Sequence, residues 1–165
     1  MEPPVVRPGS LARRVEVCRQ RAVVLPLRAW QGAIARMVRV MHNLLRTPLT
    51  IGDYTLDTRI ARTPEQRALG LMHRQELGEN EAMLFVCDEC AVQKFWMKDT
   101  PVALSIAFLD DDGTILHLDD LEPHSLEGAS SLYPVRYVLE VPRGWFAERN
   151  VALGDRVDGA VFAIA

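Results

Sequence analysis

The chain has 165 residues, 48% of them hydrophobic and 25% charged, which suits one soluble domain with an appendage. Its net charge of −3 hides an asymmetry: residues 1–46 hold 9 Arg against 2 Glu (+7), and residues 47–165 hold 10 Lys or Arg against 20 Asp or Glu (−10). Because an acidic surface repels phosphate backbones, we expect no nucleic-acid binding by the body. The arm contains no apolar run long enough for a membrane span, so the expected location is cytoplasmic.

The charge asymmetry predicts a basic arm over residues 1–47 and a separate domain over residues 48–165. In the arm, apolar residues recur every three or four positions from Trp30 to Leu44, and arginines lie on another face. This pattern predicts an amphipathic helix over residues 28–46, ended by Thr47-Pro48. Such a helix docks to a membrane surface or a protein partner, or it simply packs on the body.

The body begins with alternation over residues 54–60, which predicts a half-buried strand. A short helix follows, because Thr63 can cap it, Pro64 suits its first turn and Gln66 completes a capping box.

From residue 82 onward the hydrophobic period is two, interrupted by turn residues such as those of the Asp110–Gly113 hairpin. One helical turn is predicted at residues 145–150. The resulting fold class is mainly β: a mostly antiparallel β-sandwich or a partly open barrel with one short helix. The predicted strands are 82–87, 92–98, 103–109, 114–118, 135–141 and 156–165.

Several segments carry a family resemblance when they are taken together. They are Thr63 to Arg74, Met83-Leu84-Phe85, Phe95 to Thr100, Ile106-Ala107-Phe108, Val138 to Val141 and Gly154 to Val157. Over about residues 50–162 the chain resembles the bacterial and archaeal family called domain of unknown function 192. The resemblance implies a compact β-sandwich domain with no established catalytic residue, cofactor or substrate. Many members follow a secretion signal, so an envelope-associated location is the alternative to the cytoplasm.

The chain departs from the family pattern at three positions. Asp99 stands where the family usually has asparagine, Ser105 where it usually has aspartate, and Ala82 where it usually has glycine. The family's usual set of lysine, asparagine and aspartate is therefore Lys98, Asp99 and Ser105 in this chain. Its negative charge lies at residue 99 instead of residue 105.

The candidate ligand-binding residues end a predicted strand, where side chains reach a cleft. Lys98 is expected to bind an anionic group, with Trp96 as a stacking wall and Asp99 and Thr100 beside it. In the alternative interpretation, Lys98 pairs with Asp99 or Glu140, and Trp96 packs flat on the sheet.

Arg67 and Arg74 lie seven positions apart, on one face of the predicted helix if it extends that far. They either tie elements together through acidic residues or clamp a ligand carboxylate, and Arg74 joins the candidate binding residues for the second reason.

Two further patterns are typical of metal or thiol chemistry, but for both we favour an interpretation without a functional site. The run from His117 to His124 contains two histidines and three acidic residues, which predicts an acidic sheet edge rather than a metal site. Cys87 and Cys90 have CxxC spacing but enclose Asp88 and Glu89, which disfavour a reactive thiolate. We therefore predict no metal, no cofactor and no catalytic residue.

The leading hypothesis is a small non-enzymatic binding module for a small polar molecule, a glycan or a peptide. One alternative is an enzyme that uses Lys98, Asp99 and Glu140 as acid–base groups. The other is an adaptor that docks through helix 28–46.

Overall fold

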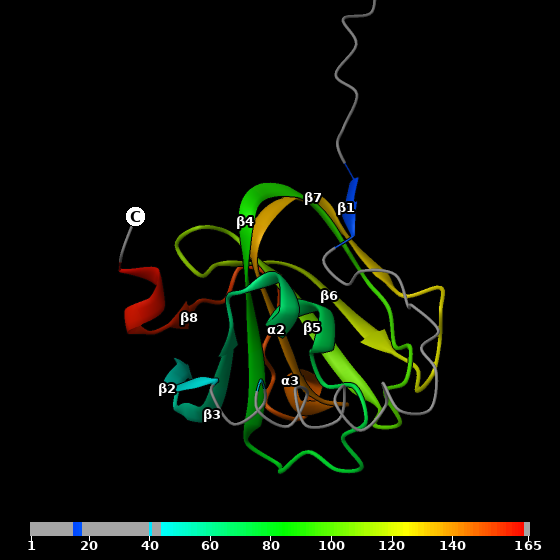
Figure 1. The fold of residues 1–165 in the computed structure, drawn as a ribbon. Coiled ribbons are helices and arrows are strands. Elements are labelled where there is room, and N and C mark those ends of the chain that lie inside the picture. Colours follow the sequence, from blue (N-terminus) through cyan, green and yellow to red (C-terminus); the bar gives the residue numbers. More distant parts are fainter. Residues whose placement is uncertain (1–14, 18–39, 41–43, 164–165) are drawn as a thin grey trace, which may run out of the picture.

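The computed structural model describes residues 15–17, 40 and 44–163 (Figure 1). Strands are its dominant element, as the alternating pattern predicts. They are β1 (Val15–Val17), β2 (Leu45–Ile51), β3 (Tyr54–Ala61), β4 (Glu81–Phe95), β5 (Leu104–Leu109), β6 (Ile115–Leu121), β7 (Ala129–Pro142) and β8 (Val157–Asp158). The short helices are α2 (Pro64–Leu69), α3 (Trp145–Glu148) and the 3-10 turn η1 (Ala160–Phe162).

Seven strands form one mixed sheet in the order β6-β5-β7-β4-β3-β2-β8, and β1 pairs with β4 off this path. The sheet curls into a half-barrel, and a bridge between Thr114 and Arg156 joins the segments that precede β6 and β8. In Figure 1 the long strands β4 and β7 arch together over one end of the molecule. Of the two predicted architectures, the partly open barrel is confirmed and the sandwich is wrong, because the path from β6 to β8 is continuous.

One pair within this path departs from the predicted antiparallel arrangement. Strands β3 and β4 run parallel, with Asp57 opposite Glu81 and Ala61 opposite Phe85. Parallel neighbours need a crossover connection, and α2 with its flanking loops supplies it.

Helix α2 begins as the sequence predicts. The Thr63 hydroxyl accepts a hydrogen bond from the Gln66 N–H at 3.3 Å, and the Gln66 side chain accepts one from the Thr63 N–H at 3.0 Å. This capping box anchors a helix of only 6 residues, too short to be stable without such contacts.

The central strands are buried on both faces, so the sheet separates two hydrophobic cores. Every residue of β5 is buried. The core on one face contains Leu49, Leu56, Leu139, Trp145 and Phe162, and the core on the opposite face contains Leu71, Phe85, Phe95, Ile106 and Phe108.

Several predicted boundaries differ from the structure, among them those of β6, which extends to Leu121, and β7, which begins at Ala129. Strand β2 begins at Leu45, which shortens the predicted helix 28–46 at its end, and the rest of that helix lies outside the described residues apart from residues 40 and 44. The predicted strands 82–87 and 92–98 are one strand, β4, that bends at a bulge between Val86 and Ala91. The predicted last strand is reduced to the two residues of β8, followed by η1.

Candidate functional site

The loop that carries the candidate residues follows β4 instead of lying within it. The prediction of a strand to residue 98 is wrong, because β4 ends at Phe95 and the backbone then turns. Met97 N–H donates to the Ser125 carbonyl at 2.8 Å, and Thr100 N–H donates to the Met97 carbonyl at 3.1 Å. These bonds hold residues 96–100 in a compact turn against the loop that contains Ser125.

Gly128 fixes the start of this loop by close backbone packing. Its φ is +67°, and a Cβ at this position would overlap the Phe95 carbonyl oxygen and lie 3.0 Å from the Cα of Trp96. Only glycine combines that conformation with such an approach.

Three backbone segments meet at what we term the left-handed junction, formed by His73, Asp99 and His124. Their φ angles are +62°, +55° and +60°, so they are three of the five described non-glycine residues with positive φ. His73 N–H donates to the Asp99 carbonyl at 2.7 Å, and His124 N–H donates to the Thr100 carbonyl at 3.1 Å. Each such conformation costs about 1 kcal/mol or more, and residues of this kind cluster at ligand-binding loops.

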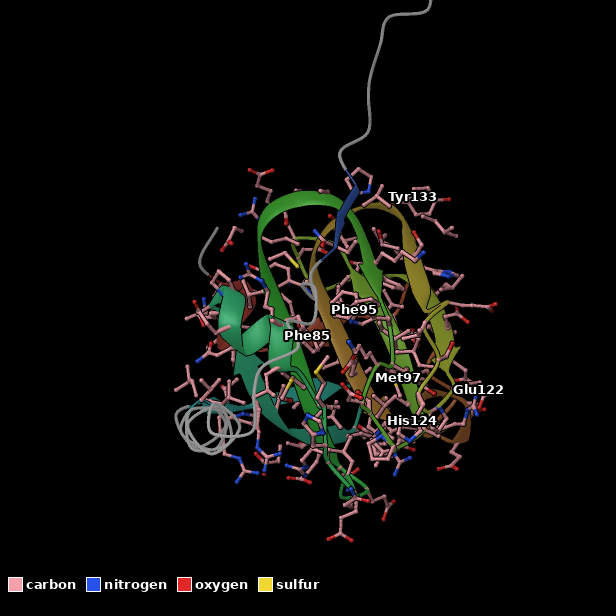
Figure 2. The ribbon with its side chains drawn as sticks, turned by 45° about the vertical axis from the view of Figure 1, so that its right-hand side comes forward. Phe85, Phe95, Met97, Glu122, His124 and Tyr133 are labelled. Atoms are coloured by element: carbon pink, nitrogen blue, oxygen red, sulfur yellow. The ribbon has the colours of Figure 1, made fainter. Side chains whose placement is uncertain are left out.

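The side chains of the junction face outward, while the loop between them turns inward. His73, Asp99 and His124 are all exposed. Met97 is buried in the same core as Phe95, and Figure 2 shows His124 at the edge of the fold below it. The junction therefore presents two imidazoles and a carboxylate on a rigid, core-anchored base.

Lys98 lies in the middle of this loop and is half-buried. The ion pairs of the described residues include none between Lys98 and Asp99. Glu140, the other partner considered for Lys98, is fully buried in β7, opposite Met83 of β4 and Ile106 of β5.

The other candidate residues of the loop contribute differently. Trp96 is half-buried, and its indole nitrogen is covered. Thr100 is fully buried, and its hydroxyl donates to the Lys98 carbonyl at 3.2 Å. Thr100 therefore shapes the backbone at Lys98 and offers no group to an incoming molecule.

Arg74 follows His73, whose N–H donates to the Asp99 carbonyl. The backbone of Arg74 therefore lies beside the loop that contains Asp99. Its guanidinium donates to Glu81 at 2.9 Å, and Glu81 also lies 3.0 Å from Arg59 and 3.3 Å from Arg46. Burial raises the pKa of Glu81, but the Gly78 N–H and the Arg59 and Arg74 guanidiniums outweigh it and leave the pKa below its ordinary value. The guanidinium of Arg74 is thus engaged in tying its loop to β4.

Arg67 has the structural role predicted for it. It is buried on α2, donates to the Val86 carbonyl at 3.0 Å and forms a two-pronged contact with Asp88. It thereby fastens α2 to the bulge of β4.

The acidic run of β6 is occupied by local contacts. Arg143 lies 2.6 Å from Glu122 and 3.6 Å from Asp120. Ser105 donates to Asp120 at 2.6 Å and accepts from the Gly144 N–H at 2.9 Å. The carboxylate beside position 105 therefore comes from the neighbouring strand β6.

Sequence reasoning did not assign His73 or His124 to the site. The sequence singles out His124 only as a possible metal ligand. A positive φ leaves no hydrophobic period in the sequence, so the pattern does not predict the left-handed junction. The available signal was residue type, since His, Asn and Asp are several-fold enriched at positive φ.

The sequence matches the DUF192 family, described as an uncharacterized ACR, over residues 47–159. The chain belongs to this family. The resemblance found in the sequence is therefore confirmed, and the family itself has no assigned activity.

Two solved structures share the fold and much of the sequence. A Sinorhizobium meliloti protein, described as a proposed transcription regulator, is 35% identical with a TM-score of 0.66, and the match covers 70% of this chain and 93% of that one. A Novosphingobium aromaticivorans protein of unknown function is 30% identical with a TM-score of 0.67, covering 70% of this chain and 86% of that one. The comparison with curated proteins gave no match.

Among the described residues, no helix combines the length and apolar character that crossing a bilayer requires.

Proposed function

We propose that the body of this DUF192 protein is a non-enzymatic binding module. Its ligand is a small polar molecule, a glycan or a peptide that carries an anionic group. The binding surface comprises Trp96, Lys98 and Asp99 with the flanking histidines of the left-handed junction. The observation that carries the proposal is this junction, in which three strained non-glycine residues are held by backbone hydrogen bonds around one lysine.

The chemistry of the surface favours an anionic, hydrogen-bonding ligand. Lys98 lies half-buried on this loop, and its ammonium would supply the positive charge for the anionic group of the ligand. Trp96 offers part of a ring for stacking, and Asp99 accepts hydrogen bonds from ligand hydroxyl or amino groups. Loops anchored on a rigid scaffold are common sites of binding.

The arrangement supports binding better than acid–base catalysis. Glu140 lies within β7, and Asp99 lies on an exposed loop, so these two carboxylates have very different surroundings. The fully buried Glu140 therefore offers no accessible group for acid–base catalysis on a bound substrate. Adaptor docking through residues 28–46 concerns a segment that lies almost wholly outside the described residues.

A thermal-shift screen of carboxylate-bearing small molecules, acidic sugars and short acidic peptides tests the proposal. A ligand present at 100 times its Kd stabilises the folded state by about 2.7 kcal/mol, which is readily measured. We expect Lys98→Ala to lose the shift while keeping the ligand-free melting temperature. Lys94→Ala, at an exposed position of β4, should keep the shift.

Two results would contradict the proposal. One is the absence of any stabilising compound, and the other is a shift that survives Lys98→Ala. A large loss of ligand-free stability in Lys98→Ala would indicate a packing role instead. The description of the Sinorhizobium meliloti protein suggests a DNA titration in parallel, for which the charge of the body predicts no binding.

A further inference from the structure

Strand β1 occupies one edge of the sheet far from the left-handed junction in sequence. Val15, Glu16 and Val17 run parallel to β4 and lie opposite Val92, Gln93 and Lys94. Figure 1 shows β1 beside the arch that β4 and β7 form. The pairing adds a strand from the arm to residues 92–94 of β4.

This edge of β4 has two successive neighbours. Strand β7 lines the other edge along both halves of β4, from Met83 opposite Glu140 to Phe95 opposite Ala129. Strand β3 pairs only with the first half and ends opposite Phe85. Among the described strands, β1 is therefore the partner of residues 92–94 on the edge of β4 that does not face β7. Its departure would expose backbone N–H and C=O groups, which readily pair with an extended peptide.

The pairing of β1 is short, so its displacement requires little energy. It involves three residue pairs, whereas strands usually have five or six residues, and parallel pairing is slightly weaker than antiparallel pairing. In the sequence, residues 18–44 connect β1 to β2. A tether of that length keeps β1 at a high effective concentration near the edge, but it adds no contact.

The surroundings indicate what kind of peptide the edge accepts. Residues 11–21 carry four arginines around Val15–Val17, and the body carries the excess of acidic residues. The exposed Asp88 and Glu89 lie on the same strand as the pairing residues, and Asp88 also contacts Arg67. Tyr133, which exposes 56% of its surface, precedes Pro134, the β7 residue that pairs with Val92 from the other edge of β4.

We propose that the β4 edge at residues 92–94 is a strand-acceptor site for extended basic peptides with β-branched residues at alternate positions. Strand β1 is the chain's own occupant, and a peptide of the same chemistry replaces it. Backbone hydrogen bonds provide the affinity in this mode of recognition, and flanking side chains provide selectivity. This site is separate from the surface around Lys98, so either proposal can fail without the other.

The test uses the full chain with Glu16→Pro, because proline removes an N–H from the middle of β1 and disfavours strand pairing. A labelled synthetic peptide of residues 11–21, with serine in place of cysteine, is titrated by fluorescence anisotropy. We expect saturable binding to the Glu16→Pro chain and at least tenfold weaker binding to the unaltered chain, whose own β1 competes. Hydrogen exchange at residues 91–95 should slow when the peptide binds.

The matched control is the same peptide with proline at the position of Glu16. It keeps the arginines but cannot pair as a strand, so we expect it not to bind. Equal binding of the two peptides would show an electrostatic contact without strand addition and would overturn the proposal. Failure of the first peptide to bind the Glu16→Pro chain, or equal affinity for both chains, would overturn it as well.

Discussion

Replacement of Gly128 by alanine tests whether the loop before β7 positions the candidate site. A Cβ at residue 128 would overlap the Phe95 carbonyl oxygen and approach the Cα of Trp96, both of which are backbone atoms. Backbone cannot rotate away as a flexible side chain can, so residues 95–96 or 128 must move. The positive φ adds strain of about 1–2 kcal/mol for any L-residue. Relief of the overlap adds about 1–3 kcal/mol, as for overpacked cores.

The matched control is Gly154→Ala. Gly154 also has a positive φ, of +90°, but nothing lies within 4 Å of a Cβ there. The control therefore carries the conformational strain without the overlap. We expect Gly128→Ala to lose about 2–5 kcal/mol of unfolding free energy and Gly154→Ala about 1–2 kcal/mol.

Urea denaturation of both variants measures the difference, with the m-value confirming that the unfolding transition is unchanged. Ligands found for the Lys98 surface should bind Gly128→Ala more weakly, because its displaced loop carries Trp96 and Lys98. If the two variants differ by less than about 0.5 kcal/mol, a scatter ordinary for neutral surface changes, the argument from close packing is wrong.

Two further predictions concern charged side chains. Arg67→Ala should lower the unfolding free energy by about 2–4 kcal/mol, because carbonyl acceptors of a buried guanidinium lose their donor. The exposed pair of Arg136 with Asp111, at 3.5 Å, provides the control: Arg136→Ala should change stability by less than about 1 kcal/mol in the same denaturant titration. Glu81→Gln should destabilise the protein at pH 7 but flatten its acid unfolding curve. The folded-state pKa of Glu81 is lowered, so its stabilisation is present above the ordinary glutamate pKa of about 4.3 and is lost as the pH falls through the folded value. An unchanged pH dependence of melting temperature between pH 3 and pH 7 in Glu81→Gln would contradict the assigned role of this carboxylate.

Much of the fold was predictable because burial leaves a period in the sequence. Alternation identified β3, β5 and β7, and a capping box identified α2. Strand β2 was missed, because Arg46 and Pro48 interrupt its pattern and its first residues are exposed. The bulge that joins two predicted strands into β4 was missed as well, because residues 88–90 are polar or exposed and resemble a turn.

The sequence by itself determined the fold class, the family and which apolar side chains of the strands are buried. These depend on local alternation and on the total hydrophobic content. It also identified Lys98 and Trp96 as neighbours in the chain. Only the tertiary structure decided that His73, Asp99 and His124 meet, that Thr100 is covered and that Glu140 is buried within β7. Those outcomes depend on which backbone carbonyl each loop N–H reaches after the sheet has curled, and pairing between residues so distant in the chain has no signature in the order of the amino acids.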